Sequence, residues 1–333
     1  LGARPGMAAA AGRRWVTIAR FAVRRLAAMV AILAIVSFLV FSLLALTPGD
    51  PAVLLLGPQK ATPEAVARIR AEFGLDDPFL VQYRDWVVAA LHGDFGRSIR
   101  SGQQVTDMIS ERVGVTVWLA GYAFVLTVLI AIPFGLVAGM RKGRLADRLA
   151  TASSLVALSA PTFAVGFLLM YVFAVQLDWF PAFGSGDGFL DTLWHMTLPA
   201  VTLAISQIAI VLRQTRAAAM DVADRDYITF ARARAVPSRR IWQRYVLHNA
   251  SLPVLTSAGL VLAYSLTGAV LVENVFALQG LGALLVVSVA QLDLPVVQAL
   301  TMFTALLVLT TNLVVDLLYF AFDPRLRRAA VAA

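Results

Sequence analysis

The 333 residues are 59% hydrophobic and only 14% charged, the formal net charge is +8, and cysteine is absent. The lack of cysteine excludes disulfides and thiolate chemistry, and the three scattered histidines predict no metal site. No G-x-x-x-x-G-K-[ST] motif for ATP phosphates is present. We therefore expect an integral membrane protein that holds no cofactor of its own.

Six apolar stretches are long enough to cross a bilayer, which takes about 20 residues per helix. They cover residues 21–46, 113–139, 149–177, 196–216, 251–275 and 296–322. A backbone inside lipid must satisfy its own hydrogen bonds, and the alternating pattern of a β-barrel is absent. We expect an all-α, polytopic membrane protein whose first stretch is retained as a transmembrane helix.

Most basic residues lie near the two termini and in the connections at 140–148 and 213–244, whereas 178–191 and 273–293 contain no Lys or Arg. Cytoplasmic connections carry such an excess, so we expect six spans with both termini cytoplasmic, and no nucleic-acid partner. The expected organisation is a cytoplasmic N-terminal tail (1–20), a first transmembrane helix (21–46), an extracytoplasmic helical loop (47–112), a five-helix core (113–322) and a cytoplasmic C-terminal tail (323–333).

The first outer loop contains signals for two short helices. Thr62-Pro63-Glu64 is typical of a helix start, and Gly74 of its end. Asp77-Pro78 opens a second helix that carries Trp86. The loop is interpreted either as a cap over the outer mouth or as a docking surface for an extracellular partner.

The cytoplasmic segment after the fourth span reads as two helices. Asp226 to Arg234 forms the first, with Tyr227, Phe230 and Ala231 toward one side. Pro237 breaks it, and Ser238 starts a second helix. That helix has one apolar stripe and one basic face, made by Ile241, Trp242, Tyr245 and Val246 and by Arg239, Arg240 and Arg244, respectively. An anionic lipid surface or a protein groove would each suit such a segment, and its construction favours the groove.

Residues Asp226 to Pro253 resemble the cytoplasmic E-A-A loop of bacterial ABC-importer permeases, in the D-Y-I-x-x-A-R-A-x-G form of the dipeptide/oligopeptide and nickel family. Further motifs of this B-type permease follow in order from about Arg14 onward. They include Thr47-Pro48-Gly49-Asp50-Pro51, Gly93-Asp94-Phe95-Gly96, Ala160-Pro161-Thr162-Phe163, Trp179-Phe180-Pro181 and Phe322-Asp323-Pro324-Arg325. Each motif alone is weak, but their shared order and spacing are specific.

The resemblance implies a type I ABC-importer permease in the bacterial inner membrane, a transport subunit and not an enzyme. It implies four kinds of partner: a second homologous permease, two cytoplasmic ATPase subunits (or one fused or duplicated ATPase) that bind ATP and Mg, an extracytoplasmic substrate-binding protein, and membrane lipid. The ATPase would grip the coupling segment, residues 217–250. Di- or oligopeptides are the expected solutes, with nickel, haem or another small solute as alternatives.

Within the coupling segment, the E-A-A triplet falls on Thr229, Phe230 and Ala231, and the glycine of the motif falls on Ala235. Alanine resists a positive φ by about 1 kcal/mol. Either the turn therefore uses an ordinary φ, with Pro237 making the break, or the coupling geometry is altered. The residues assigned to ATPase coupling are Asp226, Tyr227, Phe230, Ala231, Arg232, Ala235, Arg239, Arg240, Ile241, Tyr245 and Pro253. Tyr227, Phe230, Ile241 and Tyr245 are expected to form a ridge that a partner groove buries, with Arg232, Arg239 and Arg240 at its rim.

Three polar residues inside the spans are candidates for lining a translocation path: Gln207, Asn312 and Asp316. Alternatively, Gln207 and Asn312 join helices, and Asp316 pairs with an arginine such as Arg213 or Arg216. Trp86, Glu273 and Asn274 are candidates for contact with the binding protein.

Two other classes of protein fit less well. An ion-driven secondary transporter would have inverted halves and midplane charges, and no such repeat is visible. An intramembrane enzyme would show a catalytic pair or metal cluster, and none is apparent.

Overall fold

The computed structural model describes residues 5–46, 50–56, 61–72 and 74–322, and this part of the chain is helical apart from its connections and one bridge between Arg97 and Gln104. The outer elements come first in the chain: α1 (Pro5–Leu46), α2 (Pro51–Leu56), α3 (Pro63–Glu72) and α4 (Phe79–Leu91). The core follows: α5 (Val105–Met140), α6 (Leu145–Ser159), α7 (Thr162–Leu169), the π-helix η1 (Met170–Gln176), α8 (Phe189–Ala223), α9 (Asp226–Ala233), α10 (Ser238–Ile241), the π-helix η2 (Trp242–Val246), α11 (Leu247–Val275), α12 (Leu281–Ala290) and α13 (Leu294–Phe322). The all-α prediction is confirmed.

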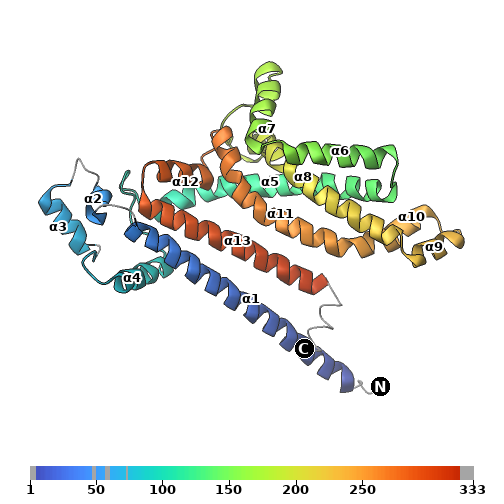
Figure 1. Cartoon of the computed structure of the whole chain (residues 1–333), viewed down its shortest axis with the longest axis horizontal. Coiled ribbons are helices and arrows are strands. Elements are labelled where there is room, and N and C mark those ends of the chain that lie inside the picture. The colour runs from blue at the N-terminus through green and yellow to red at the C-terminus, as the bar shows by residue number, and fades with distance from the viewer. Residues whose placement is uncertain (1–4, 47–49, 57–60, 73, 323–333) are drawn as a thin grey trace.

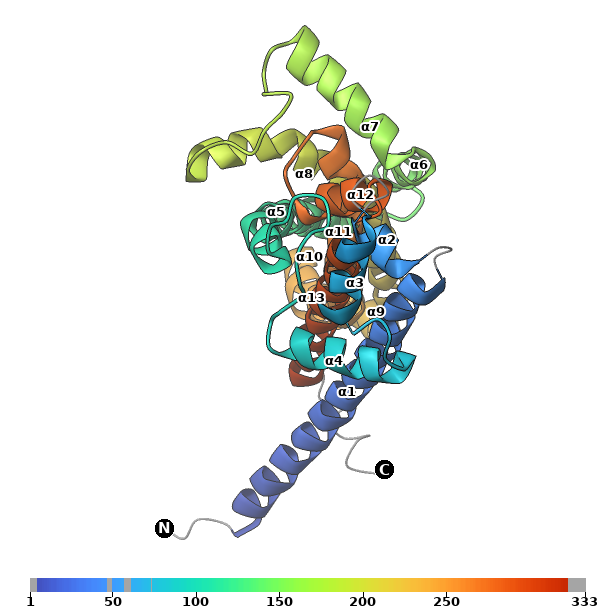
Figure 2. The same ribbon diagram turned by 90° about the vertical axis from the view of Figure 1, so that its left-hand side faces the viewer.

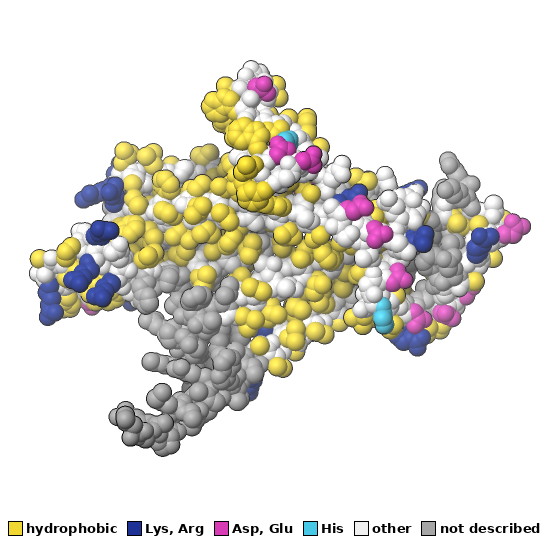
Figure 3. Space-filling view, turned by 180° about the vertical axis from the view of Figure 1, so that it is seen from behind, with side chains coloured by type: hydrophobic (Ala, Val, Ile, Leu, Met, Phe, Trp, Pro, Cys, Tyr) yellow, Lys and Arg dark blue, Asp and Glu magenta, His cyan; other side chains and the backbone are white. Residues whose placement is uncertain are grey.

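The long helices run side by side, with α5, α8 and α11 at the centre, α13 against α11, and α1 outside α13 (Figure 1). Helices α9 and α10 lie at one end of this bundle, and α2 to α4 lie at the other. Hydrophobic side chains cover the middle of the face in Figure 3, and Lys and Arg gather at the α9–α10 end. This apolar band between charged ends is the surface of a multi-pass membrane protein.

The third predicted span is broken. Five described helices are long and apolar enough to cross a membrane, and a sixth span results only if α6 and α7–η1 count as one despite a bend of 101°. The stretch predicted to span the membrane over 149–177 is therefore two helical pieces joined by a sharp bend at Pro161. Pro161 has no N–H to donate and disfavours helical geometry at Ala160, whose backbone is extended at φ −81° and ψ 126°. In the end-on view α7 diverges from the bundle (Figure 2).

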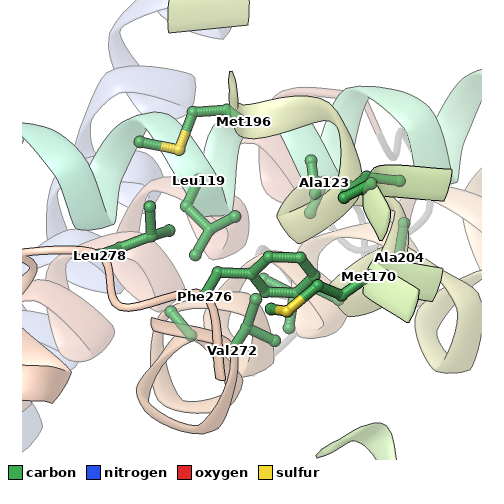
Figure 4. Close-up of a cluster of buried hydrophobic side chains, with 13 residues drawn as sticks. Leu119, Ala123, Met170, Met196, Ala204, Val272, Phe276 and Leu278 are labelled. Carbon is green, nitrogen blue, oxygen red and sulfur yellow. The ribbon is translucent and has the colours of Figure 1, made fainter. Parts of the chain in front are cut away.

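Close backbone contact holds α5 against α8. A Cβ atom added to Gly135 would lie 2.8 Å from the carbonyl oxygen of Leu212, and one added to Gly139 would lie 2.6 Å from that of Arg216. Only glycine permits such an approach, and the two glycines are four residues apart on one side of α5. Toward the α12 end of the bundle, side chains from α5, η1, α8 and α11 converge around the buried ring of Phe276 (Figure 4).

The outer loop contains the two predicted helices, α3 and α4, and a further short helix, α2. The backbone N–H of Ala65 donates to Thr62 Oγ1 at 3.3 Å, and Gly74 follows α3 at φ +57°. The loop after α4 is fixed to the bundle by Asp293, a buried carboxylate between α12 and α13 that accepts hydrogen bonds from Ser98 Oγ and from the backbone N–H of Ile99.

Candidate functional site

The coupling segment contacts its own chain through a buried apolar face. Ile228 and Val246 are fully buried, and Ala231 and Ile241 nearly so, against side chains of α5 and α8. The expectation that Ile241 and Ala231 face a partner is therefore wrong. Ile228 was missed by the sequence analysis, although its spacing of three from Ala231 marks an inward helical stripe.

An aromatic face remains on the outside of the segment. Phe230 is 69% exposed and Tyr227 is 40% exposed. The ring of Tyr227 lies 6.2 Å from that of Tyr245, which is half-buried, so the second helix supports the first. Arg232 on α9 and Arg239 and Arg240 on α10 are also exposed, as is Asp226. We call Tyr227, Phe230 and these three arginines the display face; it keeps half of the predicted ridge and all of its rim.

The turn at Ala235 has the conformation that glycine usually supplies. Its φ is +52°, which excludes the first of the two alternatives, an ordinary φ at this turn. The N–H of Ala235 donates to the carbonyl of Arg232 at 2.9 Å, and the N–H of Val236 to that of Ala231 at 3.0 Å. These are the two bonds of a Schellman motif, and Val236 packs on the buried face as the motif requires. The turn keeps its shape and bears the strain of a left-handed alanine.

Ion pairs hold the base of the segment. Lys142, in the loop between α5 and α6, contacts Asp224 at 3.1 Å, and Arg225 contacts Asp221 at 2.9 Å. The hydrogen bond that the Arg225 guanidinium donates to Asp221 raises the pKa of Arg225 above its usual value. One helix away, Arg216 pairs with the buried Asp147, whose other oxygen accepts the N–H of Gly143 at 2.8 Å. Pro253 lies inside α11, which starts earlier than predicted, at Leu247.

The polar residues of the spans lie in three different settings. Gln207 is buried where α5, α8 and α11 meet, and its Oε1 accepts hydrogen bonds from Thr127 at 3.3 Å and Ser265 at 3.1 Å. It joins helices in this structure, which is the alternative to a path-lining role. Asp316 pairs with Arg25 of α1 at 3.1 Å, so a local arginine partner exists but is neither of the two expected. Asn312 lines a pocket of about 360 Å³ beside this pair.

The candidates for binding-protein contact also separate. Glu273 is fully buried: one oxygen accepts a hydrogen bond from Thr116 at 2.6 Å, and the other accepts the N–H of Ala283 at 3.0 Å. It caps the start of α12 and does not reach the surface, so its placement at an outer contact is wrong. Asn274 is exposed, and Trp86 lines an outer pocket of about 500 Å³.

Within the described residues no three His, Asp or Glu side chains come together as a metal site. The arrangement presents an exposed aromatic and basic surface at one end of the bundle, carried by helices that continue into the long apolar helices α8 and α11.

Comparison with known proteins covers nearly all of the chain. The family model for "Binding-protein-dependent transport system inner membrane component" matches residues 131–328, and the model for the N-terminal part of such membrane components matches residues 18–120. A probable peptide ABC transporter permease protein of Sinorhizobium fredii is 36% identical over 310 residues, which cover 92% of this chain and 99% of that relative. The glutathione transport system permease protein GsiC of Salmonella typhimurium is 38% identical over 307 residues, which cover 92% of this chain and 98% of that relative. A putative peptide transport system permease protein of Brucella abortus is 39% identical over 308 residues, which cover 91% of this chain and 98% of that relative.

Proposed function

The chain belongs to the family of binding-protein-dependent transport system inner membrane components, and we propose its function on that premise. The two family models match its N-terminal part and its core, respectively. The chain is an inner-membrane permease subunit of an ABC importer. The solute that we infer is a peptide, because the relatives that match over more than nine-tenths of the chain are named as peptide and glutathione permeases. A second permease of the same family would complete the path, and a binding protein would deliver the solute.

The observation that carries the coupling proposal is the division of the coupling segment into two faces. Its buried face packs on α5 and α8, while the display face holds a large exposed ring, Phe230, and exposed arginines of α9 and α10. An exposed aromatic surrounded by charge is the usual anchor of a protein interface. We infer that an ATPase subunit binds the display face and that movement of the segment is transmitted to α8 and α11, which flank it without a flexible linker.

The proposed orientation places the display face in the cytoplasm. Helix α1 begins and α13 ends toward the end of the bundle that carries α9 and α10 (Figure 1), and basic side chains gather at that end (Figure 3). Both termini would then be cytoplasmic, and the helices α2 to α4 would be extracytoplasmic. A reporter inserted at Gly186 should be accessible from outside and one at Ser238 from inside, and the reverse pattern would contradict the orientation.

The coupling proposal is tested with Phe230→Asp in the assembled importer. We expect the ATPase to co-purify at least about tenfold less well, since loss of a central aromatic anchor commonly weakens an interface by 2 kcal/mol or more. The matched control is Leu145→Asp, because Leu145 is 71% exposed at the start of α6 and makes the same change of charge on another element. Unchanged ATPase binding by Phe230→Asp, or an equal loss in both variants, would contradict the assignment of the display face.

A further inference from the structure

A groove between α6 and α8 contains an arginine that has no partner among the described residues. The groove has a volume of about 510 Å³ and is lined by Thr151, Leu155, Leu158, Ile210, Arg213, Gln214, Arg216 and Ala217. Arg216 is neutralised by Asp147. Arg213 is exposed in the groove, and among the described residues its guanidinium has no ion-pair or hydrogen-bond partner.

The position of Arg213 along α8 sets its depth in the membrane. The residues from Met196 to Leu212 carry no charge, and 17 helical residues span about 25 Å, close to the thickness of a bilayer core. Arg213 is the first charged residue after this run, on the side of the α9–α10 end. Its guanidinium therefore lies at the level where lipid phosphates begin.

The walls of the groove change character along its length. Beyond Arg213, toward the middle of the bundle, lie Ile210 and two leucines that remain largely accessible: Leu155 is 56% exposed and Leu158 is 37% exposed. In the other direction lies the basic loop at 141–144 between α5 and α6, in which Lys142 pairs with Asp224 outside the groove. A ligand that fits has an anionic group at one end and a hydrocarbon chain at the other.

We propose that this groove binds an anionic phospholipid of the cytoplasmic leaflet. Arg213 would bind the phosphate, Gln214 would donate a further hydrogen bond, and an acyl chain would lie on Leu155 and Leu158. Charge complementarity favours an anionic lipid, because basic pockets between membrane helices attract anionic headgroups. The groove lies between α6 and α8, which are parts of the membrane-spanning bundle. The site is independent of the solute that the importer carries.

The test measures binding of phosphatidylglycerol to the purified, assembled importer in detergent by native mass spectrometry. We expect Arg213→Gln to weaken this binding about tenfold or more, as the loss of a charge-assisted hydrogen bond predicts. Arg213→Lys should keep most of the affinity, and Leu158→Trp should reduce it by filling the groove while leaving the charge in place. If both of these variants behave as expected, misfolding of Arg213→Gln does not explain its loss of lipid binding.

Two matched variants separate a site from general attraction. Arg148→Gln removes an exposed charge from the same end of α6, and Arg68→Gln removes one from the outer helix α3; both should change the affinity less than about threefold. Equal losses for Arg213→Gln and Arg148→Gln would show diffuse attraction and overturn the proposal. Equal binding of phosphatidylcholine, displacement of the lipid by glycerol phosphate alone, or displacement by a dipeptide would overturn it too, the last by assigning the groove to the solute.

Discussion

The strained turn of the coupling segment yields a prediction with opposite signs at two neighbouring alanines. Ala235 has φ +52° and both hydrogen bonds of a Schellman motif. Glycine accepts this φ without the contact between Cβ and the backbone, so Ala235→Gly should stabilise the turn by about 1 kcal/mol. Ala233 is the last residue of α9, where glycine is worse than alanine by up to about 1 kcal/mol. Ala233→Gly should therefore weaken the same end of α9.

Hydrogen exchange measures this difference locally. The amides of Ala235 and Val236 close the motif, so their exchange reports opening of the turn. Exchange at Val236 should slow about fivefold in Ala235→Gly and accelerate in Ala233→Gly, since 1 kcal/mol corresponds to about that factor. The two variants differ only in the position of the same methyl deletion. Faster or unchanged exchange in Ala235→Gly would show that the left-handed alanine is not strained and would refute the reasoning.

Three further predictions concern other parts of the fold. Gly139→Ala should destabilise the chain by about 1–3 kcal/mol because its Cβ meets the α8 backbone, whereas Gly121→Ala, with open space around it, should not; thermal unfolding in detergent compares them. Ile241→Ala should lower the free energy of unfolding by about 2–5 kcal/mol, as for a core residue, and an effect confined to ATPase binding would contradict its burial. The hydrogen bond from Arg70 lowers the pKa of Asp50. The stability that this carboxylate contributes is therefore present above its ordinary pKa of about 4 and is lost as the pH falls through the lowered pKa. An NMR titration should show a higher Asp50 pKa in Arg70→Gln.

The sequence predicted the elements that depend on local signals. The helix starts in the outer loop follow from Thr62 and Pro78, and the close approach of α5 and α8 follows from two glycines four residues apart. Pro161 disfavours helical geometry at Ala160, but the angle of 101° depends on packing that no local pattern contains. Gly166, for example, fits α7 against Thr202 of α8 and Val275 of α11.

The sequence predicted the two helices of the coupling segment, but not which face of each helix is buried against the chain itself. Both helices of the coupling segment are amphipathic, and a sequence alone does not say whether an apolar stripe contacts its own chain or a partner. Ile241 belongs to the inward stripe because α8 and α5 offer it a buried surface. The prediction that Glu273 contacts the binding protein was wrong for a related reason. A carboxylate at a helix end is expected in solvent, but here Thr116 and the start of α12 enclose it.

The separation of the two faces of the coupling segment also affects how such a subunit can change over generations. The side chains that anchor the segment, such as Ile228 and Val246, are not those that it displays, such as Phe230 and Arg240. Replacements on the display face leave the internal packing intact. On the proposal that an ATPase subunit binds this face, the preference for one ATPase over another can therefore change without loss of folding, and two duplicated importers can come to use separate ATPases through a few surface substitutions.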